Sequence, residues 1–161
     1  MKNLLVYAVI GLGVVAYNVA TQADRDDTGA IVAGGNVDAF KMRIGDCFDD
    51  TGSISTAEGG EVSSLPGVPC HEPHDNEVYA VFDVTIDSFP NDDAMSELAF
   101  DSCRSRFDNF VGTDYESSSL DILTLYPTRD SWLQQGDREV VCALFDMNAN
   151  KLVGTAKDQA I

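Results

Sequence analysis

The longest run of apolar residues lies at the amino terminus, where residues 4–20 contain one strongly polar side chain, Asn18. As a helix, this run would be roughly 25 Å long, which is enough to cross a hydrocarbon core with some local thinning. The run therefore predicts a transmembrane helix, in an anchor that comprises residues 1–23 and contacts membrane lipid through residues 4–20. A signal peptide that ends at Ala23 is the alternative.

The charges beside this run indicate its direction across the membrane. Lys2 precedes the run, and a single arginine among three aspartates follows it, at Asp24, Arg25, Asp26 and Asp27. Positive charge is retained on the cytoplasmic side of a membrane span. We therefore expect a single-pass protein of the cytoplasmic membrane, with its amino terminus inside and its C-terminal domain on the extracytoplasmic side.

A second pattern, between Asn91 and Gly112, has the periodicity of an amphipathic helix. Asn91 can cap the first turn, and Gly112 is placed to end the last one. The pattern predicts a helix over residues 92–111 with Cys103 on its buried side. The apolar residues that recur at helical spacing are Met95, Leu98, Ala99, Cys103, Phe107, Phe110 and Val111.

The remaining apolar segments have the β-branched content or the alternation that is typical of strands. Residues 24–39 are polar and contain glycine, so we expect a flexible linker there and a folded domain over residues 40–161. The order of elements predicts an α+β domain, in which one amphipathic helix packs on a mainly antiparallel sheet. Strands are expected at residues 40–48, 77–86, 119–128, 138–147 and 152–158, with a long loop before Pro69. Residues 130–137, which carry Trp132, are expected to form a turn or a single helical turn.

The charge of the chain narrows the choice of partners. The sequence has 27 acidic and 10 basic residues, a formal net charge of −17, and every acidic residue follows the apolar run. Such a surface is repelled by nucleic acid and by anionic lipid headgroups, and it keeps a secreted domain soluble. We therefore expect no nucleic-acid partner.

The four cysteines are Cys47, Cys70, Cys103 and Cys142. An even number in a domain outside the membrane indicates two disulfides, for which three pairings are possible. Cys142 lies on one face of a predicted strand, and it would meet Cys103 if the helix packed on that face. This arrangement favours Cys103–Cys142 and Cys47–Cys70. The alternative is Cys47–Cys142 with Cys70–Cys103.

The stretch "CHEPH", Cys70 to His74, contains a cysteine and both histidines of the chain. A zinc site would need further ligands, and no second CxxC or HxxxH supplies them. A cysteine nucleophile would need a free thiolate, whereas Cys70 is expected in a disulfide. No GxSxG, HExxH or phosphate-binding glycine loop occurs. We therefore expect no catalytic residue, metal or cofactor, and we interpret His71 and His74 as parts of a polar turn.

Several stretches together resemble the septum formation domain family of actinobacteria. They are "IGDCFDD", "VPCHEPHDNEVYAVFDV", "FP" before the predicted helix, "YPT" followed by "SW", and "GDREVVCALFD", within residues 43–156. The resemblance implies a membrane-anchored or lipid-anchored extracytoplasmic domain, linked by name to cell division, with no established catalytic activity. The family-type positions are Gly45, Asp46, Cys47, Cys70, Pro73, His74, Glu77, Val78, Cys103, Trp132 and Cys142.

Two functional hypotheses follow. The first is a non-enzymatic, membrane-anchored interaction domain that works in cell-envelope or septum assembly through a protein partner in the membrane or envelope. The second is an accessory subunit of a larger actinobacterial membrane complex, such as a respiratory supercomplex or a transporter. Ala16 and Ala20, four residues apart in the apolar run, would allow the close helix approach that the second hypothesis needs.

Overall fold

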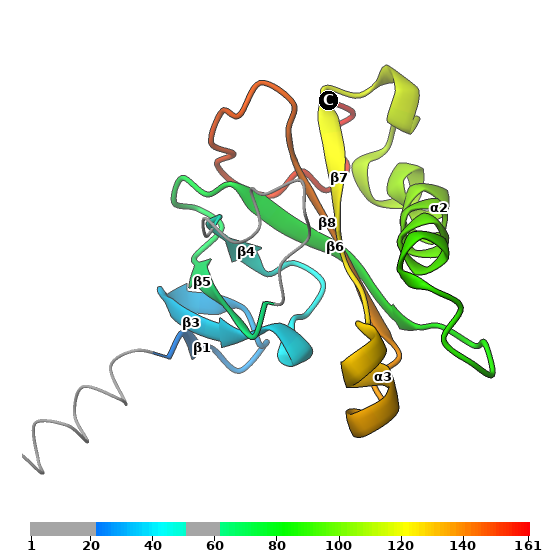
Figure 1. The fold of residues 1–161 in the computed structure, drawn as a ribbon. Coiled ribbons are helices and arrows are strands. Elements are labelled where there is room, and N and C mark those ends of the chain that lie inside the picture. Colours follow the sequence, from blue (N-terminus) through cyan, green and yellow to red (C-terminus); the bar gives the residue numbers. More distant parts are fainter. Residues whose placement is uncertain (1–21, 51–61) are drawn as a thin grey trace, which may run out of the picture.

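The computed structural model describes residues 22–50 and 62–161, so the predicted membrane-spanning run, residues 4–20, lies outside the described residues. Within the described ranges, no helix has the combination of length and apolar content that a membrane crossing requires. The elements are β1 (Asp24–Arg25), β2 (Ile31–Ala33), β3 (Gly35–Asp38), η1 (Ala39–Lys41), β4 (Cys47–Phe48), β5 (Ser64–Val68), β6 (Asn76–Asp83), α2 (Asp92–Val111), η2 (Tyr115–Ser117), β7 (Leu120–Leu125), α3 (Arg129–Gln135) and β8 (Glu139–Asp146) (Figure 1).

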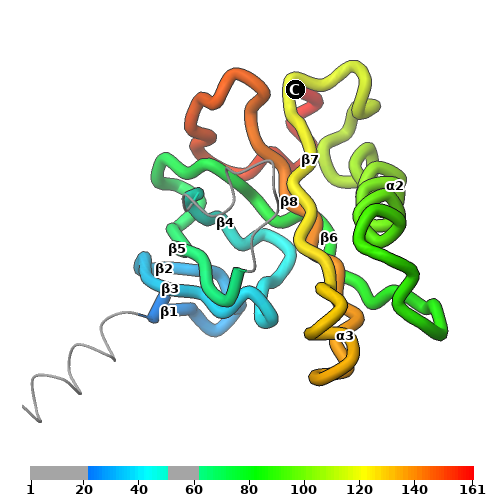
Figure 2. Tube along the Cα trace, in the orientation of Figure 1, coloured from blue at the N-terminus to red at the C-terminus, as the bar shows by residue number. Residues whose placement is uncertain are grey.

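A six-stranded sheet forms the centre of the molecule. Its strand order is β3-β5-β4-β6-β8-β7, and each neighbouring pair is antiparallel. β1 and β2 form a separate two-stranded ribbon, which lies beside β3 in Figure 2. The α+β class and the mainly antiparallel sheet are confirmed. The short helix α3 forms where a turn or a single helical turn was predicted.

Helix α2 forms where the periodicity predicted it, and both of its ends have the expected caps. The side chain of Asn91 accepts a hydrogen bond from the backbone N–H of Ala94, and Asp92 and Asp93 place negative charge in the first turn. Gly112 has a φ of +88°, in the left-handed region that a glycine adopts without strain, and ends the helix.

The alternation of β8 divides the core into two parts. Val140, Cys142 and Leu144 are fully buried on the side of the sheet that α2 covers. Val141 and Ala143 face the other way, into a second apolar cluster formed with β3, β4 and β5. Full burial of one large apolar side chain contributes about 1.5–3 kcal/mol, so both faces of the sheet contribute to stability.

The prediction of a flexible linker over residues 24–39 is wrong. This segment forms β1, β2 and β3, and β3 pairs with β5 over four residues. A side chain at Gly35 would place its Cβ 2.4 Å from the backbone carbon of Gln22. The glycine therefore permits a close approach of two backbone segments. From the sequence alone, the same glycine suggested a flexible segment.

Several other strand boundaries also differ from the prediction. Over residues 40–48 the chain forms η1 and a loop, and only Cys47 and Phe48 pair as a strand, because Gly45 has a φ of +87° that interrupts the extended backbone. The loop expected before Pro69 contains β5. The strand predicted at residues 152–158 is absent from the described structure, where Leu152 makes one isolated bridge to His74.

Candidate functional site

Most of the family-type positions come together where β4 meets β6. We call Gly45, Asp46, Cys47, Cys70, His74 and Glu77 the motif cluster. Cys47 is paired with Glu77 across the two strands, and it forms a disulfide with Cys70 with a Cα–Cα distance of 5.2 Å. The second disulfide joins Cys103 to Cys142, so the predicted pairing is confirmed for both bonds.

Asp46 attaches the first strand to the sheet. Its carboxylate is 2% exposed and accepts hydrogen bonds from Nη1 and Nη2 of Arg25, at 2.5 and 2.7 Å. The backbone N–H of Arg43 donates to the same carboxylate at 2.8 Å. The hydrogen bonds that Arg25 donates to Asp46 raise the pKa of Arg25 above its ordinary value. This bidentate geometry fits a guanidinium better than an ammonium.

Gly45 and the Cys47–Cys70 disulfide shape the same turn. The backbone N–H of Gly45 donates to the carbonyl of Val78 at 2.8 Å, and the N–H of Val78 donates to the carbonyl of Asp46 at 2.8 Å. The carbonyl oxygen of Gly45 lies 3.2 Å from Sγ of Cys70. The positive φ of Gly45 is what allows the chain to turn here and then enter β4.

His74 is fully buried and belongs to the fold. Its Nδ1 lies 2.8 Å from the carbonyl oxygen of Glu72, which assigns the ring proton to Nδ1 as a donor. Nε2 has no hydrogen-bond partner among the described residues. The backbone of His74 exchanges two hydrogen bonds with Leu152, at 3.0 and 2.8 Å. His71, by contrast, is exposed and lies 4.0 Å from the carboxylate of Glu72.

Glu77 attaches the C-terminal segment, residues 151–161, to β6. Its carboxylate is 1% exposed and accepts hydrogen bonds from Oγ1 of Thr155 and from the backbone N–H of Ala156, the latter at 2.7 Å. The backbone N–H of Gly154 donates to the carbonyl of Cys70 at 2.7 Å. The segment then passes the end of α2, where the N–H of Ala160 donates to the carbonyl of Val111 (Figure 2).

Trp132 lies elsewhere in the fold, on α3. Its ring is 4% exposed, the guanidinium carbon of Arg138 lies 3.4 Å from the ring centroid, and the ring of Phe89 makes an edge contact at 5.9 Å. The sequence motif that contains Trp132 therefore belongs to a second site of packing, at the opposite end of β6 from the motif cluster (Figure 1).

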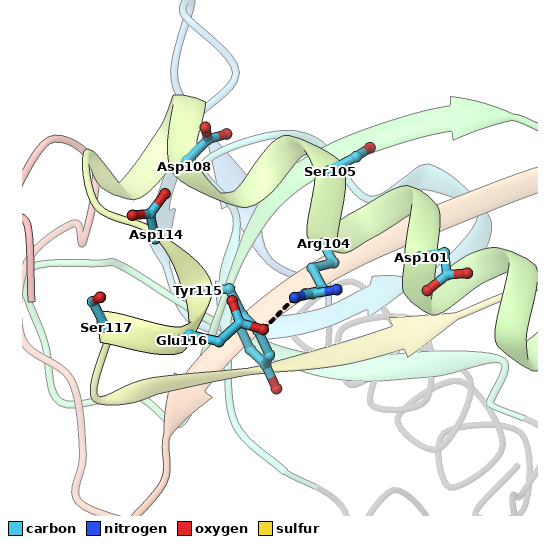
Figure 3. Close-up of a pocket in the computed structure, with 8 residues that line it drawn as sticks. All are labelled: Asp101, Arg104, Ser105, Asp108, Asp114, Tyr115, Glu116 and Ser117. Carbon is cyan, nitrogen blue, oxygen red and sulfur yellow. Dashed lines mark hydrogen bonds and ion pairs between the residues drawn. The ribbon is translucent and has the colours of Figure 1, made fainter.

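A surface depression lies between α2 and η2, and Figure 3 shows the side chains that line it. Arg104 points toward Glu116 and forms an ion pair with it. The hydroxyl of Tyr115 donates to Asp121 at 2.6 Å, and this hydrogen bond is the main reason why the pKa of Tyr115 rises to about 12. Sequence reasoning did not find this depression, because acidic residues on an exposed helix face are ordinary in so acidic a chain.

The motif cluster forms a structural junction. Its residues hold β1, through Arg25, and the C-terminal segment, through Ala156 and Leu152, to the main sheet. The sulfur of Cys70 is in a disulfide, so it is not a thiolate ligand or nucleophile. Within residues 22–50 and 62–161, no three His, Cys, Asp or Glu side chains are placed to hold a metal ion. Sequence reasoning missed Arg25, Leu152 and Thr155, which complete the junction from both ends of the domain.

A family model described as septum formation matches residues 44–160 of the chain, which confirms the resemblance seen in the motifs. The match extends from just before the motif cluster to the end of the C-terminal segment that Glu77 holds. No curated protein matches the chain. No solved structure matches it either.

Proposed function

Since the chain belongs to the septum formation family, we propose that it is a membrane-anchored, extracytoplasmic interaction domain that acts in septum or cell-envelope assembly and catalyses no reaction. Its place would be the outer face of an actinobacterial cytoplasmic membrane. The apolar run of residues 4–20 would be the anchor, and the acidic lobe after it would meet a protein partner.

This proposal rests on the structural role of the family-type polar residues. Asp46 binds Arg25, Glu77 binds Ala156, and the backbone of His74 binds Leu152, so each one holds a distant part of the chain. All three side chains are buried, and a catalytic group must be reachable by its substrate. Polar residues that hold the domain together in this way fit a domain that presents a surface to a partner.

The two disulfides support the extracytoplasmic location. Such bonds persist in oxidising environments and are rare in the cytosol. The charge pattern around the apolar run, with Lys2 before it and only acidic residues and Arg25 in the next few charged positions, favours the same direction of insertion.

Purification of the full chain in mild detergent tests this proposal. A tag at the C-terminus would retrieve the protein with its associated proteins, which mass spectrometry would identify and quantify. The proposal expects division or envelope-assembly proteins to be enriched. A stoichiometric respiratory or transport complex would contradict it and support the accessory-subunit hypothesis. Recovery of the chain alone, after cross-linking in intact cells, would contradict both.

A matched pair of variants sharpens this experiment. Glu77→Gln weakens the attachment of the C-terminal segment, whereas Glu72→Gln changes an exposed residue and leaves that attachment intact. If the motif cluster serves only to hold the presenting surface in shape, enrichment of the partner falls in the first variant together with thermal stability, and it is unchanged in the second.

A further inference from the structure

The surface between η1 and α3 contains a groove that the motif cluster does not use. Phe40 of η1 lines one side, and the residues that connect α3 to β8 line the other, with Asp83 at the end of β6. η1 and α3 lie at the lower end of the molecule in Figure 1, and β1, with which the described chain begins, is at the same end. We call this feature the η1–α3 groove.

Among the described residues, the groove carries negative charge that no ion pair balances. Asp83 and Glu139 are direct partners across β6 and β8, and like charges in such positions are destabilising. Neither takes part in an ion pair within the described residues. Burial, and then the charges of Asp83 and Asp137, raise the pKa of Glu139.

Of the described residues that line the groove, only Arg138 is a cation, and its guanidinium is engaged elsewhere. The guanidinium of Arg138 stacks on the ring of Trp132 at 3.4 Å and donates hydrogen bonds to the carbonyl oxygens of Trp132 and Asp137. Arg138 therefore makes no ion pair with Asp83 or Glu139 among the described contacts. An uncompensated pair of carboxylates is left for an outside cation.

Large apolar side chains are exposed on η1 and α3, the two elements that border the groove. Phe40, which lines the groove, is 48% exposed. Leu133 is 67% exposed and lies on α3 one turn before Gly136, another lining residue. An exposed aromatic ring beside carboxylates is a favourable place for a guanidinium or an ammonium, because the ring face attracts cations.

We propose that the η1–α3 groove docks a basic, amphipathic segment of a partner protein. The partner's arginine or lysine side chains lie against Phe40 and pair with Asp83 and Glu139, while its apolar residues cover Leu133. The charge of the groove excludes a membrane surface with anionic headgroups, and the net charge of −17 opposes a second copy of the chain. This inference rests on the proposed function as an interaction domain and names the surface it uses.

The single tryptophan of the sequence gives the experiment its signal. Trp132 lies directly under Arg138, a lining residue, so occupation of the groove changes its fluorescence. The full chain in a non-ionic detergent is titrated with a short synthetic helical peptide that carries arginine and leucine on one face. Two matched peptides have glutamate in place of arginine, or serine in place of leucine.

Two double variants with the same net charge separate the groove from the general acidity of the protein. Asp83→Asn with Glu139→Gln removes the carboxylates of the groove. Asp101→Asn with Asp108→Asn removes two exposed carboxylates on α2, beside the other depression. The proposal expects the arginine–leucine peptide to bind about tenfold more weakly to the first variant, a change of about 1.4 kcal/mol, and with unchanged affinity to the second.

Equal loss of affinity in the two double variants would overturn the proposal, since it would show attraction to net charge alone. Equal binding of the three peptides would also overturn it. Phe40→Ser and Leu133→Ser test the apolar part, and each is expected to weaken binding severalfold.

The same double variants keep this inference separate from the proposed function. If the tagged Asp83→Asn, Glu139→Gln chain still retrieves the wild-type set of partners from cross-linked cells, the domain acts in assembly through another surface and the groove assignment fails. If the partners are lost from this variant and retained by the Asp101→Asn, Asp108→Asn chain, both proposals are supported.

Discussion

The two disulfides are placed in very different surroundings. Cys103 and Cys142 are fully buried between α2 and β8, among apolar side chains of the larger core. Cys47 is buried too, but Cys70 is partly exposed and lies in a network of polar contacts that hold both ends of the domain. One bond therefore reinforces packing, and the other reinforces a junction of hydrogen bonds.

Loop length alone predicts nearly the same stabilisation for the two disulfides. They close loops with sequence separations of 39 and 23 residues. In the chain-entropy model these loops correspond to roughly 4 and roughly 3.5 kcal/mol, a difference of only about 0.5 kcal/mol. The comparison teaches that burial, more than loop length, should decide which bond matters more for stability and which is accessible to reagents.

The largest effect is expected from removing the core disulfide. Cys103→Ala with Cys142→Ala loses the loop constraint and leaves space in a closely packed region, so the free energy of unfolding should fall by about 4–5 kcal/mol. Thermal and denaturant unfolding followed by circular dichroism would measure the loss. A smaller loss than for the other disulfide would contradict the role assigned to burial.

Removal of the junction disulfide should cost less and act more locally. Cys47→Ala with Cys70→Ala is expected to lower the free energy of unfolding by about 3 kcal/mol. Amide hydrogen exchange should accelerate at Gly154, which donates to the carbonyl of Cys70, before it accelerates in α2. Uniform acceleration throughout the domain would show that the junction is not a separate unit.

Glu77→Gln tests the hydrogen bonds of the junction while both disulfides stay intact. The amide keeps the size of the side chain but replaces one charged acceptor by a donor that faces Thr155 or Ala156, so a loss of about 2 kcal/mol is expected. Glu72→Gln, at an exposed position, should change stability by less than about 0.5 kcal/mol. Equal thermal shifts in the two variants would remove Glu77 from the junction.

The smallest effect should have the opposite sign. Burial and neighbouring carboxylates raise the pKa of Glu139, so ionised Glu139 destabilises the folded state above that pKa. Glu139→Gln should therefore stabilise the protein at neutral pH by a few tenths of a kcal/mol, roughly the size of a cross-strand charge effect. The gain should vanish as the pH falls below the ordinary pKa of glutamate. A gain that persists in acid, seen in thermal melts across pH, would assign it to another cause.

Local patterns made part of the fold predictable. The spacing of apolar residues located α2, and Asn91 and Gly112 marked its ends, because each signal acts within a few residues. The alternation of β8 placed Cys142 on the face that α2 covers, which was enough to choose the disulfide pairing.

The junction could not be predicted, because its partners are distant and carry no pattern. Arg25 and Asp46 are separated by 21 positions, and Glu77 and Ala156 by 79. Nothing near Arg25 distinguishes an arginine that binds a buried carboxylate from one that stays in solvent. The strands β1 to β3 were missed for a related reason, since Gly35 serves a close approach that is visible only when both segments are in place.

The attachment of β1 through Arg25 also determines how the domain would respond to tension. Any pull that enters from the amino-terminal side would be carried first by the Arg25–Asp46 pair and by the short β3–β5 ladder. Helix α2, its sulfur bridge to β8 and the larger apolar core lie further along the load path. We therefore expect β1, β2 and β3 to detach under tension, and to re-form afterwards, while the rest of the domain stays folded.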